Sequence, residues 1–373
     1  MTSTPNQSPA TPVFQQADFE NITRVVTEQF QVEESMMELG LPTYYLKEHQ
    51  ETKQHFLKLL KNLDSMNLIA FLRRTNGRIL LKVVPKPPVR KSDIRWNWVL
   101  LFATIGTTLL TGYILSLDFV NRGLMPNPYI GAAAFTIAIM TILGAHEMGH
   151  KLTANRSGIE ATPPYFIPGP PPISGFLGIG TFGAVIMQKS LAPNKDALFD
   201  VGSSGPIVGF VLALVATAVG LYLSPIVPTT GEVGLPVPLI FELIGAFFIS
   251  IPANHDVLLH PIAFAGWVGM IVTMLNLLPA AMLDGGHIAR SILGDKARLI
   301  LTGLSILMLI VAGFWPMAIL VLFMSTYRHP GPLDDVSPLS SRKKLYAVGL
   351  VVVFVLCSYF QYFFYFLMQV FGL

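Results

Sequence analysis

The residues whose types and spacing most clearly suggest chemistry are His146, Glu147 and His150, in the run AHEMGH over residues 145–150. Residues four positions apart lie on one face of a helix, so the two imidazoles can bind one metal ion. Glu147 lies between them, where a carboxylate can accept a proton from water at the metal. Because the chain has only 8 His, a chance match to this pattern is rare. The run predicts a metal site that activates water.

The segment in front of this motif is apolar. Residues 130–143 carry no charged side chain, so the motif is expected within or at the edge of a bilayer. The alternative interpretation is a polar helical cluster that serves packing or ion transport. Ionisable groups in a membrane span are costly and are retained mostly for function, which favours the metal site.

The composition divides the chain into two parts. Of its 373 residues 52% are hydrophobic and 13% are charged, and the charged share is about half of that in soluble domains. Residues 1–95 contain 13 of the 25 Lys and Arg and 10 of the 22 Asp and Glu. This predicts a soluble N-terminal domain followed by a polytopic membrane domain. The basic residues lie where membrane topology would place them, so we expect no nucleic-acid partner.

The expected fold is an all-α polytopic membrane protein with about six to seven transmembrane helices, plus a small N-terminal α+β soluble domain. In the soluble part, Asn76-Gly77 predicts a hairpin at the end of the order helix, strand, helix, hairpin. The expected divisions are a disordered tail over 1–18, a cytoplasmic α+β domain over 19–92, a membrane-embedded core over 96–326, a cytoplasmic loop over 327–344 and a C-terminal transmembrane helix over 345–373.

Apolar runs define the membrane core. The spans are expected over 96–117, 129–154, 201–223, 257–283 and 345–371. Residues 299–314 and 316–326 form either one span or a helical hairpin that turns at residues 313–316. The run over 238–251 contains Glu242 and is short for a crossing, so it is expected to lie at the interface or to be re-entrant.

The basic residues also predict the orientation. With the N-terminal domain inside, only Arg122 of the 25 Lys and Arg falls outside, as the positive-inside rule requires. The loop over 224–254 carries no basic residue and is expected outside. We therefore expect a multi-pass protein of the cell membrane with a cytoplasmic N-terminus, or of a thylakoid or plastid membrane if the host is a plant. The polar N-terminus does not resemble a transit peptide, which favours a prokaryotic host.

A catalytic zinc site needs a third protein ligand and a position left for water. An extended His-x-x-Gly-x-x-His motif is excluded because position 156 is Arg156. Glu160 follows a Ser-Gly break and is expected to be a solvated loop charge. Asp284 is the better candidate, since in the expected topology it lies at the same depth as His146 and His150. Its alternative role is to cap the helix that follows.

With these residues the chain resembles the site-2 protease family, the membrane-embedded zinc metalloproteases of peptidase type M50. The resemblance covers residues 96–330. It rests on HEMGH over 146–150, on NLLP over 276–279 with LDGGH over 283–287, and on GSSGP over 202–206. No PDZ-like insertion separates the third and fourth expected spans, which is similar to the archaeal, cyanobacterial and chloroplast branch.

The resemblance implies one Zn2+ per chain, with His146, His150 and Asp284 as ligands. It implies Glu147 as the catalytic acid/base and Asn276 as a residue that helps to hold substrate or the oxyanion. The implied activity is that of an endopeptidase that cleaves transmembrane segments of protein substrates in a lipid bilayer, in regulated intramembrane proteolysis. The alternatives are a metal-ion or proton-coupled transporter, for which we see no internal repeat, and a catalytically silent membrane scaffold.

The family also implies a re-entrant, β-containing loop between the second and third spans. The prolines over 163–172 exclude a helix, and the run after them alternates small and β-prone residues like an edge strand. We predict that this strand binds an extended substrate by strand addition. The alternative is an interfacial loop without a substrate role. The predicted substrate-binding residues are Thr181, Phe182, Gly183, Ala184, Val185, Ile186 and Met187.

The remaining candidates have weaker patterns. His287 lies three residues after Asp284 and is expected beside the site, or equally as a helix cap. We expect His329 to be a solvated loop residue, and Gly205 and Gly209 to serve helix–helix contacts. The N-terminal domain is hypothesised to recognise substrate or to gate access.

Overall fold

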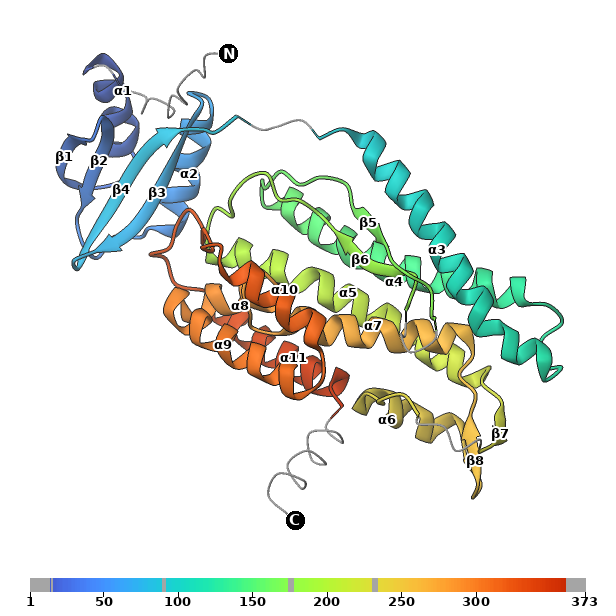
Figure 1. Cartoon of the computed structure of the whole chain (residues 1–373). Helices are drawn as coiled ribbons and strands as arrows, with labels where there is room; N and C mark the ends of the chain where they lie inside the picture. Colours follow the sequence, from blue (N-terminus) through green and yellow to red (C-terminus); the bar gives the residue numbers. More distant parts are fainter. Residues whose placement is uncertain (1–13, 15, 89–91, 174–177, 230–233, 360–373) are drawn as a thin grey trace, which may run out of the picture. The chain divides into compact units, whose positions relative to one another are not determined.

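The computed structural model describes residues 14, 16–88, 92–173, 178–229 and 234–359, and it divides the chain into two compact units (Figure 1). The N-terminal unit contains the chain up to Arg90 together with Leu191–Lys195 and Gly331–Leu339. The helical unit contains the rest. Most of the expected tail over 1–18, and the expected C-terminal helix beyond Tyr359, lie outside the described residues.

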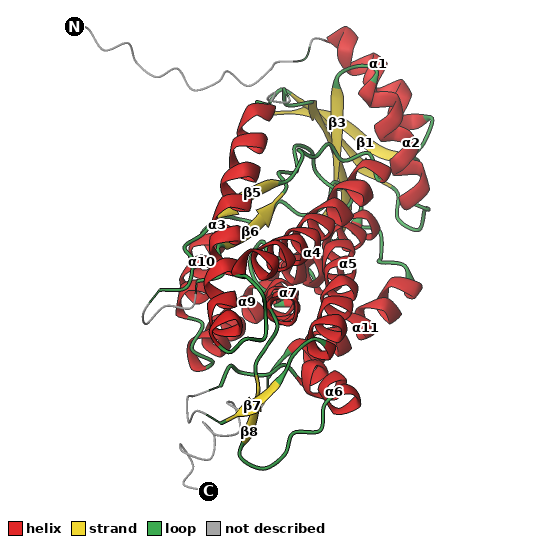
Figure 2. Cartoon of the chain, turned by 90° about the vertical axis from the view of Figure 1, so that its right-hand side faces the viewer, coloured by secondary structure: helices red, strands yellow, loops and turns green. Residues whose placement is uncertain are grey.

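The N-terminal unit is an antiparallel sheet with two helices on one face (Figures 1 and 2). Its elements are α1 (Gln16–Thr27), β1 (Val32–Glu38), β2 (Leu41–Leu46), α2 (Lys53–Asp64), β3 (Leu68–Thr75) and β4 (Arg78–Pro85), with strand order β1-β2-β4-β3. Alternate residues of β3 and β4 are buried, as the two-residue period of a half-buried strand requires. These residues and the apolar faces of both helices form the core of the unit.

The hairpin expected at Asn76-Gly77 is present, and both turn residues have a positive φ. The expected single strand before α2 is wrong, because β1 and β2 form a second hairpin. Its turn is Leu39-Gly40, also with positive φ at both positions. Leu rarely adopts this conformation, so the sequence carried no recognisable turn signal there. Helix α1 also begins at Gln16, inside the expected tail.

Two segments from later in the chain complete the N-terminal unit. Leu72 of β3 donates a backbone hydrogen bond to Leu333 O and accepts one from Asp335 N. Leu333 N in turn donates to Ala192 O. The sheet is therefore continued past β3 by residues 333–335 and then by residues 192–194. An N-terminal domain that ends at residue 92 is incomplete, because sequence distance concealed these two segments.

The helical unit contains three helices that are long and apolar enough to cross a membrane, judged by length and composition over the described residues. They are α3 (Ile94–Asn121), α4 (Pro128–Arg156) and α5 (Lys195–Tyr222). Figure 2 shows α4 and α5 beside α7 (Pro261–Leu277), and side chains from these three helices form the main core. Mostly helical architecture with a small sheet region agrees with the expected fold class.

The expected span over 257–283 is shorter as a helix. Helix α7 ends at Leu277, residues 278–283 form a turn, and α8 (Asp284–Leu293) begins a new helix. Pro279 has no N–H to donate and forces Leu278 into an extended conformation, so the helix cannot continue. This break brings Asp284 to the first position of α8.

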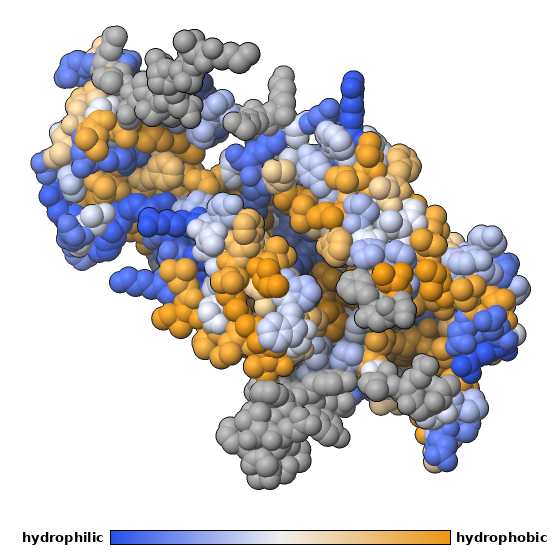
Figure 3. Space-filling model, viewed as in Figure 1, coloured by the Kyte–Doolittle hydropathy of each residue, from blue (hydrophilic) through white to orange (hydrophobic). Residues whose placement is uncertain are grey.

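The run over 299–326 forms two helices, α9 (Asp295–Val311) and α10 (Trp315–Ser325), which contact each other. Of the two interpretations of this run, the helical hairpin is therefore the one that the structure supports. Figure 3 shows apolar residues gathered over α9 and α10. Ile300, Leu307 and Phe323 of these helices are exposed. Helix α11 (Ser341–Cys357) follows the segment that enters the N-terminal unit.

Between α4 and α5 the chain forms an antiparallel hairpin of β5 (Tyr165–Pro168) and β6 (Thr181–Val185). Helix α3 supports this hairpin, since Thr107 Oγ1 donates to Gly180 O at 2.6 Å and Asn97 Nδ2 donates to Pro164 O at 2.9 Å. The strand expected over 181–187 is thus present over 181–185. The loop after α5 contains a second hairpin, β7 (Ile226–Pro228) with β8 (His255–Val257), and α6 (Leu239–Phe248).

Candidate metal centre

Helix α4 presents His146, Glu147 and His150 as buried side chains. The two imidazoles lie on the same face, and their Nε2 atoms are 3.1 Å apart. His150 Nδ1 lies 2.6 Å from Val201 O on α5. A carbonyl oxygen only accepts hydrogen bonds, so Nδ1 carries the proton and Nε2 keeps its lone pair for a ligand.

Asp284 closes the group. Its Oδ2 lies 3.3 Å from His146 Nε2 and its Oδ1 lies 3.3 Å from His150 Nε2. Leu283 is the N-cap residue of α8, and the Asp284 side chain is directed at the two histidines rather than at the helix end. The alternative role of Asp284 as a cap has no support in this arrangement.

The donor set fits a zinc ion. Zinc–nitrogen and zinc–oxygen bonds of about 2.0–2.1 Å at tetrahedral angles place ligand atoms roughly 3.3 Å from one another. The three distances between His146, His150 and Asp284 are 3.1, 3.3 and 3.3 Å. Among the described residues, this is the group of His, Cys, Asp or Glu that could hold a metal ion. Two imidazoles and a carboxylate leave one tetrahedral position for water or substrate.

The turn before Asp284 is fixed by α9. Ala281 has a φ of 45°, an uncommon value for a residue with a side chain, and both of its backbone polar groups are paired. Ala281 N donates to Thr302 Oγ1 at 3.0 Å, and Ala281 O accepts from Arg298 Nη1 at 3.3 Å. Gly285 allows α8 to start against the last carbonyls of α7, which a Cβ would strike. The position of Asp284 therefore depends on tertiary contacts.

Helix α5 provides space for the imidazoles. A Cβ on Gly205 would collide with the His150 ring, and a Cβ on Gly209 would lie 2.9 Å from His146 Nδ1. On the same helix, a Cβ on Gly202 would lie 3.0 Å from Asp284 O. Gly205 and Gly209 were expected to serve helix contacts alone. The signal that could have revealed their role is their alignment on one helix face with Gly202.

Glu147 lies at the edge of the group, with Oε1 3.9 Å from His146 Nε2. Its carboxylate accepts a hydrogen bond from the backbone of Ile186, the residue that follows β6. Asn276, near the end of α7, places Nδ2 3.4 Å from His146 Nε2. Glu147 and Asn276 therefore both lie next to His146, which is one of the candidate ligands.

The predicted substrate-binding run is in part exposed. Phe182 is 68% exposed, Val185 and Met187 are also exposed, and Thr181 is buried. Thr181 Oγ1 accepts from Gly183 N and donates to Ile167 O, which fixes an irregularity in the pairing of the two strands. In the described residues, this sheet has two strands, so the outer edge of β6 has no strand beside it.

His287 and His329 form a pair that the sequence did not indicate. His287 Nδ1 lies 2.6 Å from His329 Nε2, and His329 is only 7% exposed. The expected solvated position of His329 is wrong. Burial, with the positive charge of Arg298 nearby, holds the pKa of His329 well below its ordinary value, so its ring is neutral. His287 lies three residues after Asp284 on α8, and its partner is another histidine.

The described residues thus combine three helices that are long and apolar enough to cross a membrane with a His-His-Asp group that could hold a metal ion. Comparison with known families agrees, since the family described as Peptidase family M50 matches residues 134–312. The match covers just under half of the chain and includes His146, Glu147, His150, Asn276 and Asp284.

Curated relatives are zinc metalloproteases by name. The chain is 31% identical over 243 residues to "Probable zinc metalloprotease EGY1, chloroplastic" of Arabidopsis thaliana, covering 61% of this chain and 43% of the relative. It is 30% identical over 300 residues to "Probable zinc metalloprotease EGY2, chloroplastic" of Oryza sativa subsp. indica, covering 74% and 51%. The chain thus spans about half the length of these relatives. No solved structure matches the chain.

Proposed function

We propose that this chain is an intramembrane zinc-dependent endopeptidase that cleaves transmembrane segments of membrane-protein substrates. The observation that carries the proposal is the juxtaposition of His146, His150 and Asp284 with Glu147, on and beside an apolar helix long enough to cross a bilayer. The family M50 domain and the names of the zinc metalloprotease relatives support it.

In this proposal His146, His150 and Asp284 hold the ion. A zinc ion in such a site supplies a Lewis acid that polarises a carbonyl group and lowers the pKa of water. The hydrogen bond from His150 Nδ1 to Val201 O fixes the tautomer and the ring orientation, so that Nε2 faces the donor group. Gly205 and Gly209 let α5 approach the rings closely enough for this contact.

Glu147 acts as the general base and then as the general acid. Its carboxylate accepts a proton from the water that attacks the scissile carbonyl, and it gives the proton to the departing amine. The hydrogen bond from Ile186 N–H orients this carboxylate beside β6. Asn276, at 3.4 Å from His146 Nε2, donates from Nδ2 to the oxygen on which negative charge develops.

We further propose that the substrate binds as an extended strand along the outer edge of β6. A helix hides its peptide bonds, so a transmembrane substrate must unwind before cleavage. Strand addition would satisfy the backbone groups that unwinding exposes. The backbone of Met187 pairs with Thr162 on one side, whereas Ile186 N–H points to Glu147 on the other. A strand added on that side would pass the catalytic carboxylate.

The proposed orientation places the N-terminal unit on the side to which basic loops belong. In a prokaryotic host this is the cytoplasmic side of the cell membrane, whereas in a plant host the membrane would be that of a thylakoid or plastid. The same orientation would place Lys195 of α5 and Lys343 of α11 on that side. Cysteine labelling of an added residue in the N-terminal unit, in intact cells against permeabilised cells, measures this orientation directly.

The proposal is tested by cleavage of a model transmembrane substrate in liposomes, with the zinc content of each preparation measured. Glu147→Gln is expected to abolish cleavage and to retain about one zinc per chain, because it removes the base and leaves the ligands. Glu160→Gln is the matched control, since Glu160 lies on an exposed loop. Equal cleavage by Glu147→Gln and wild type would exclude this mechanism. Zinc binding with no cleavage by wild type would favour transport or scaffolding.

A further inference from the structure

The two segments that complete the N-terminal unit are held there by side chains as well as by the backbone. Leu333 is 4% exposed and belongs to the core of the unit, and Leu191 packs against the same core. Arg73 Nη1 donates to Leu333 O at 2.7 Å. Oγ1 of Thr52, the N-cap residue of α2, lies 2.7 Å from Ser337 Oγ. We refer to residues 191–195 and 333–337 as the inserted pair.

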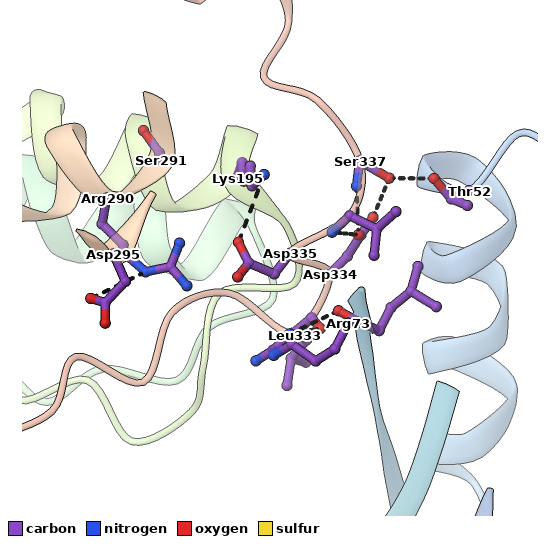
Figure 4. A network of polar contacts seen from close by, with 12 residues as sticks. Thr52, Arg73, Lys195, Arg290, Ser291, Asp295, Leu333, Asp334, Asp335 and Ser337 are labelled. Carbon is purple, nitrogen blue, oxygen red and sulfur yellow. Dashed lines mark hydrogen bonds and ion pairs between the residues drawn. The ribbon is translucent and has the colours of Figure 1, made fainter. Parts of the chain in front are cut away.

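Asp334 organises the inserted pair internally. Its fully buried carboxylate accepts from Val336 N and Ser337 N at 2.9 Å each and is also bonded to the Ser337 hydroxyl. Figure 4 shows Ser337 turned toward Thr52 and Leu333 beside Arg73. These hydrogen bonds fix the conformation of residues 334–337, so the segment is an ordered part of the N-terminal unit.

The first segment of the pair leads directly to the catalytic carboxylate. Residues 187–190 connect Leu191 to Ile186, whose N–H donates to Glu147. This connection is itself paired, since Lys189 N donates to Glu160 O at 2.7 Å and Thr162 N donates to Met187 O at 3.0 Å. Because this connection is short and paired with residues 160–162, we expect a shift of Leu191 to change the Ile186–Glu147 contact.

The second segment leads to the ligand Asp284. Residues 330–332 connect Leu333 to His329, which pairs with His287 at 2.6 Å. His287 lies one helical turn after Asp284 on α8. A Cβ on Gly202 would lie 3.0 Å from both Asp284 O and His287 Cβ, so α8 packs tightly against α5 at this point. The N-terminal unit thus has short covalent routes to two points of the metal centre.

We infer that the N-terminal unit positions the catalytic centre through the inserted pair, with Leu333 and His329 as positioning residues. One route holds Ile186 against Glu147, and the other holds His329 against His287 beside Asp284. The inference rests on the proposed function, which assigns His146, His150 and Asp284 to zinc binding and Glu147 to catalysis. A ligand or partner that displaces residues 333–337 from β3 would then loosen both contacts and reduce cleavage.

The first experiment releases the inserted pair. Leu333→Ala in the full-length protein removes a buried side chain of the pair, and Leu39→Ala is the matched control, because Leu39 is 85% exposed on the β1–β2 turn. Backbone hydrogen exchange of Ile186 in liposomes reports the first route, and the rate of zinc release to a chelator reports the second. We expect both to rise by about tenfold in Leu333→Ala and to stay unchanged in Leu39→Ala.

The second experiment separates the routes. His329→Ala is expected to increase zinc release by about tenfold while the exchange of Ile186 stays at the wild-type rate. His329→Gln keeps an amide near the position of Nε2 and is expected to restore slow zinc release, which a general loss of packing would not do. If Leu333→Ala unfolds the N-terminal unit, residues 191–195 and 333–337 are also released. Faster Ile186 exchange and faster zinc release are then still expected.

Failure of this inference can be told from failure of the proposed function. A wild-type protein that cleaves no substrate removes the protease assignment, whereas the exchange and zinc measurements are made without substrate. Leu333→Ala with the same Ile186 exchange and the same zinc release as Leu39→Ala would overturn the inference even if the wild type is an active protease.

Discussion

The candidate ligands come from two regions of backbone that differ in regularity. His146 and His150 lie one turn apart in the middle of α4, a helix of 29 residues whose own hydrogen bonds set their spacing. Asp284 follows the turn over residues 278–283, which contains a proline and a residue with positive φ. The conformation of α4 is set by its own hydrogen bonds, whereas the turn before Asp284 is held by hydrogen bonds to side chains of α9.

This difference indicates that the site is more rigid at α4 than at the turn over residues 278–283. The backbone positions of His146 and His150 cannot shift relative to each other without breaking hydrogen bonds of the helix. The turn before Asp284 can move whenever Thr302 or Arg298 releases Ala281. We therefore expect substitutions near α4 to abolish metal binding outright and substitutions around the turn to weaken it by degrees.

The largest expected effect is the loss of a ligand. His150→Ala leaves two donor groups and should lower both zinc content and cleavage, the latter by about a thousandfold or more, as expected when about 4 kcal/mol of metal assistance is lost. Asp284→Asn should lose less zinc than His150→Ala, because the amide keeps an oxygen donor at the same place. Zinc per chain after dialysis measures both. Full zinc retention by His150→Ala would remove His150 from the ligand set.

The next effect tests the close approach of α5. In Gly205→Ala the added Cβ collides with the His150 ring, so the ring or the helix must shift. A ligand displaced by about 1 Å is expected to cost roughly a hundredfold in cleavage. Gly303→Ala on α9 is the control, since a Cβ there meets no atom within 4 Å. Cleavage rates of the two variants decide the point, and equal rates would mean that α5 adjusts without cost.

The same contrast explains what could be predicted from the sequence. The spacing of His146 and His150 fixes their shared face as soon as a helix forms, and apolar runs predicted α3, α4 and α5. Asp284 could be proposed from its motif and its expected depth. The contacts that hold it could not, because Thr302 and Arg298 come from another helix and no local pattern links them to Ala281.

The N-terminal unit shows more clearly that contacts between segments far apart in the sequence could not be predicted. The Asn76-Gly77 hairpin was readable because its turn chemistry is local. The strands contributed by residues 192–194 and 333–335 were not, since each is short and lies far along the chain from β3. His329 was expected in solvent for the same reason: it is buried and pairs with His287, which lies 42 residues earlier in the chain.

An intermediate effect is expected from the turn itself. Arg298 is almost fully buried, and it bonds to Ala281 O and to Asp295. Arg298→Met keeps most of the volume but leaves the Ala281 carbonyl without this donor, at a cost of about 2 kcal/mol. We expect a lower melting temperature in detergent and faster zinc release, with the zinc stoichiometry still near one. Unchanged zinc release would mean that the turn keeps its shape without Arg298.

The smallest effect isolates a single hydrogen bond of the turn. Thr302→Val removes the hydroxyl that accepts from Ala281 N while keeping the shape of the side chain, so a buried N–H loses its partner at a cost of about 1 kcal/mol. Thr302→Ser keeps the hydroxyl and is the matched control. Zinc release should be about fivefold faster in Thr302→Val than in Thr302→Ser. Because Thr302 lies on α9, outside the candidate ligand group, such a difference would show that the turn before Asp284, and not α4, limits how firmly the site holds its ion.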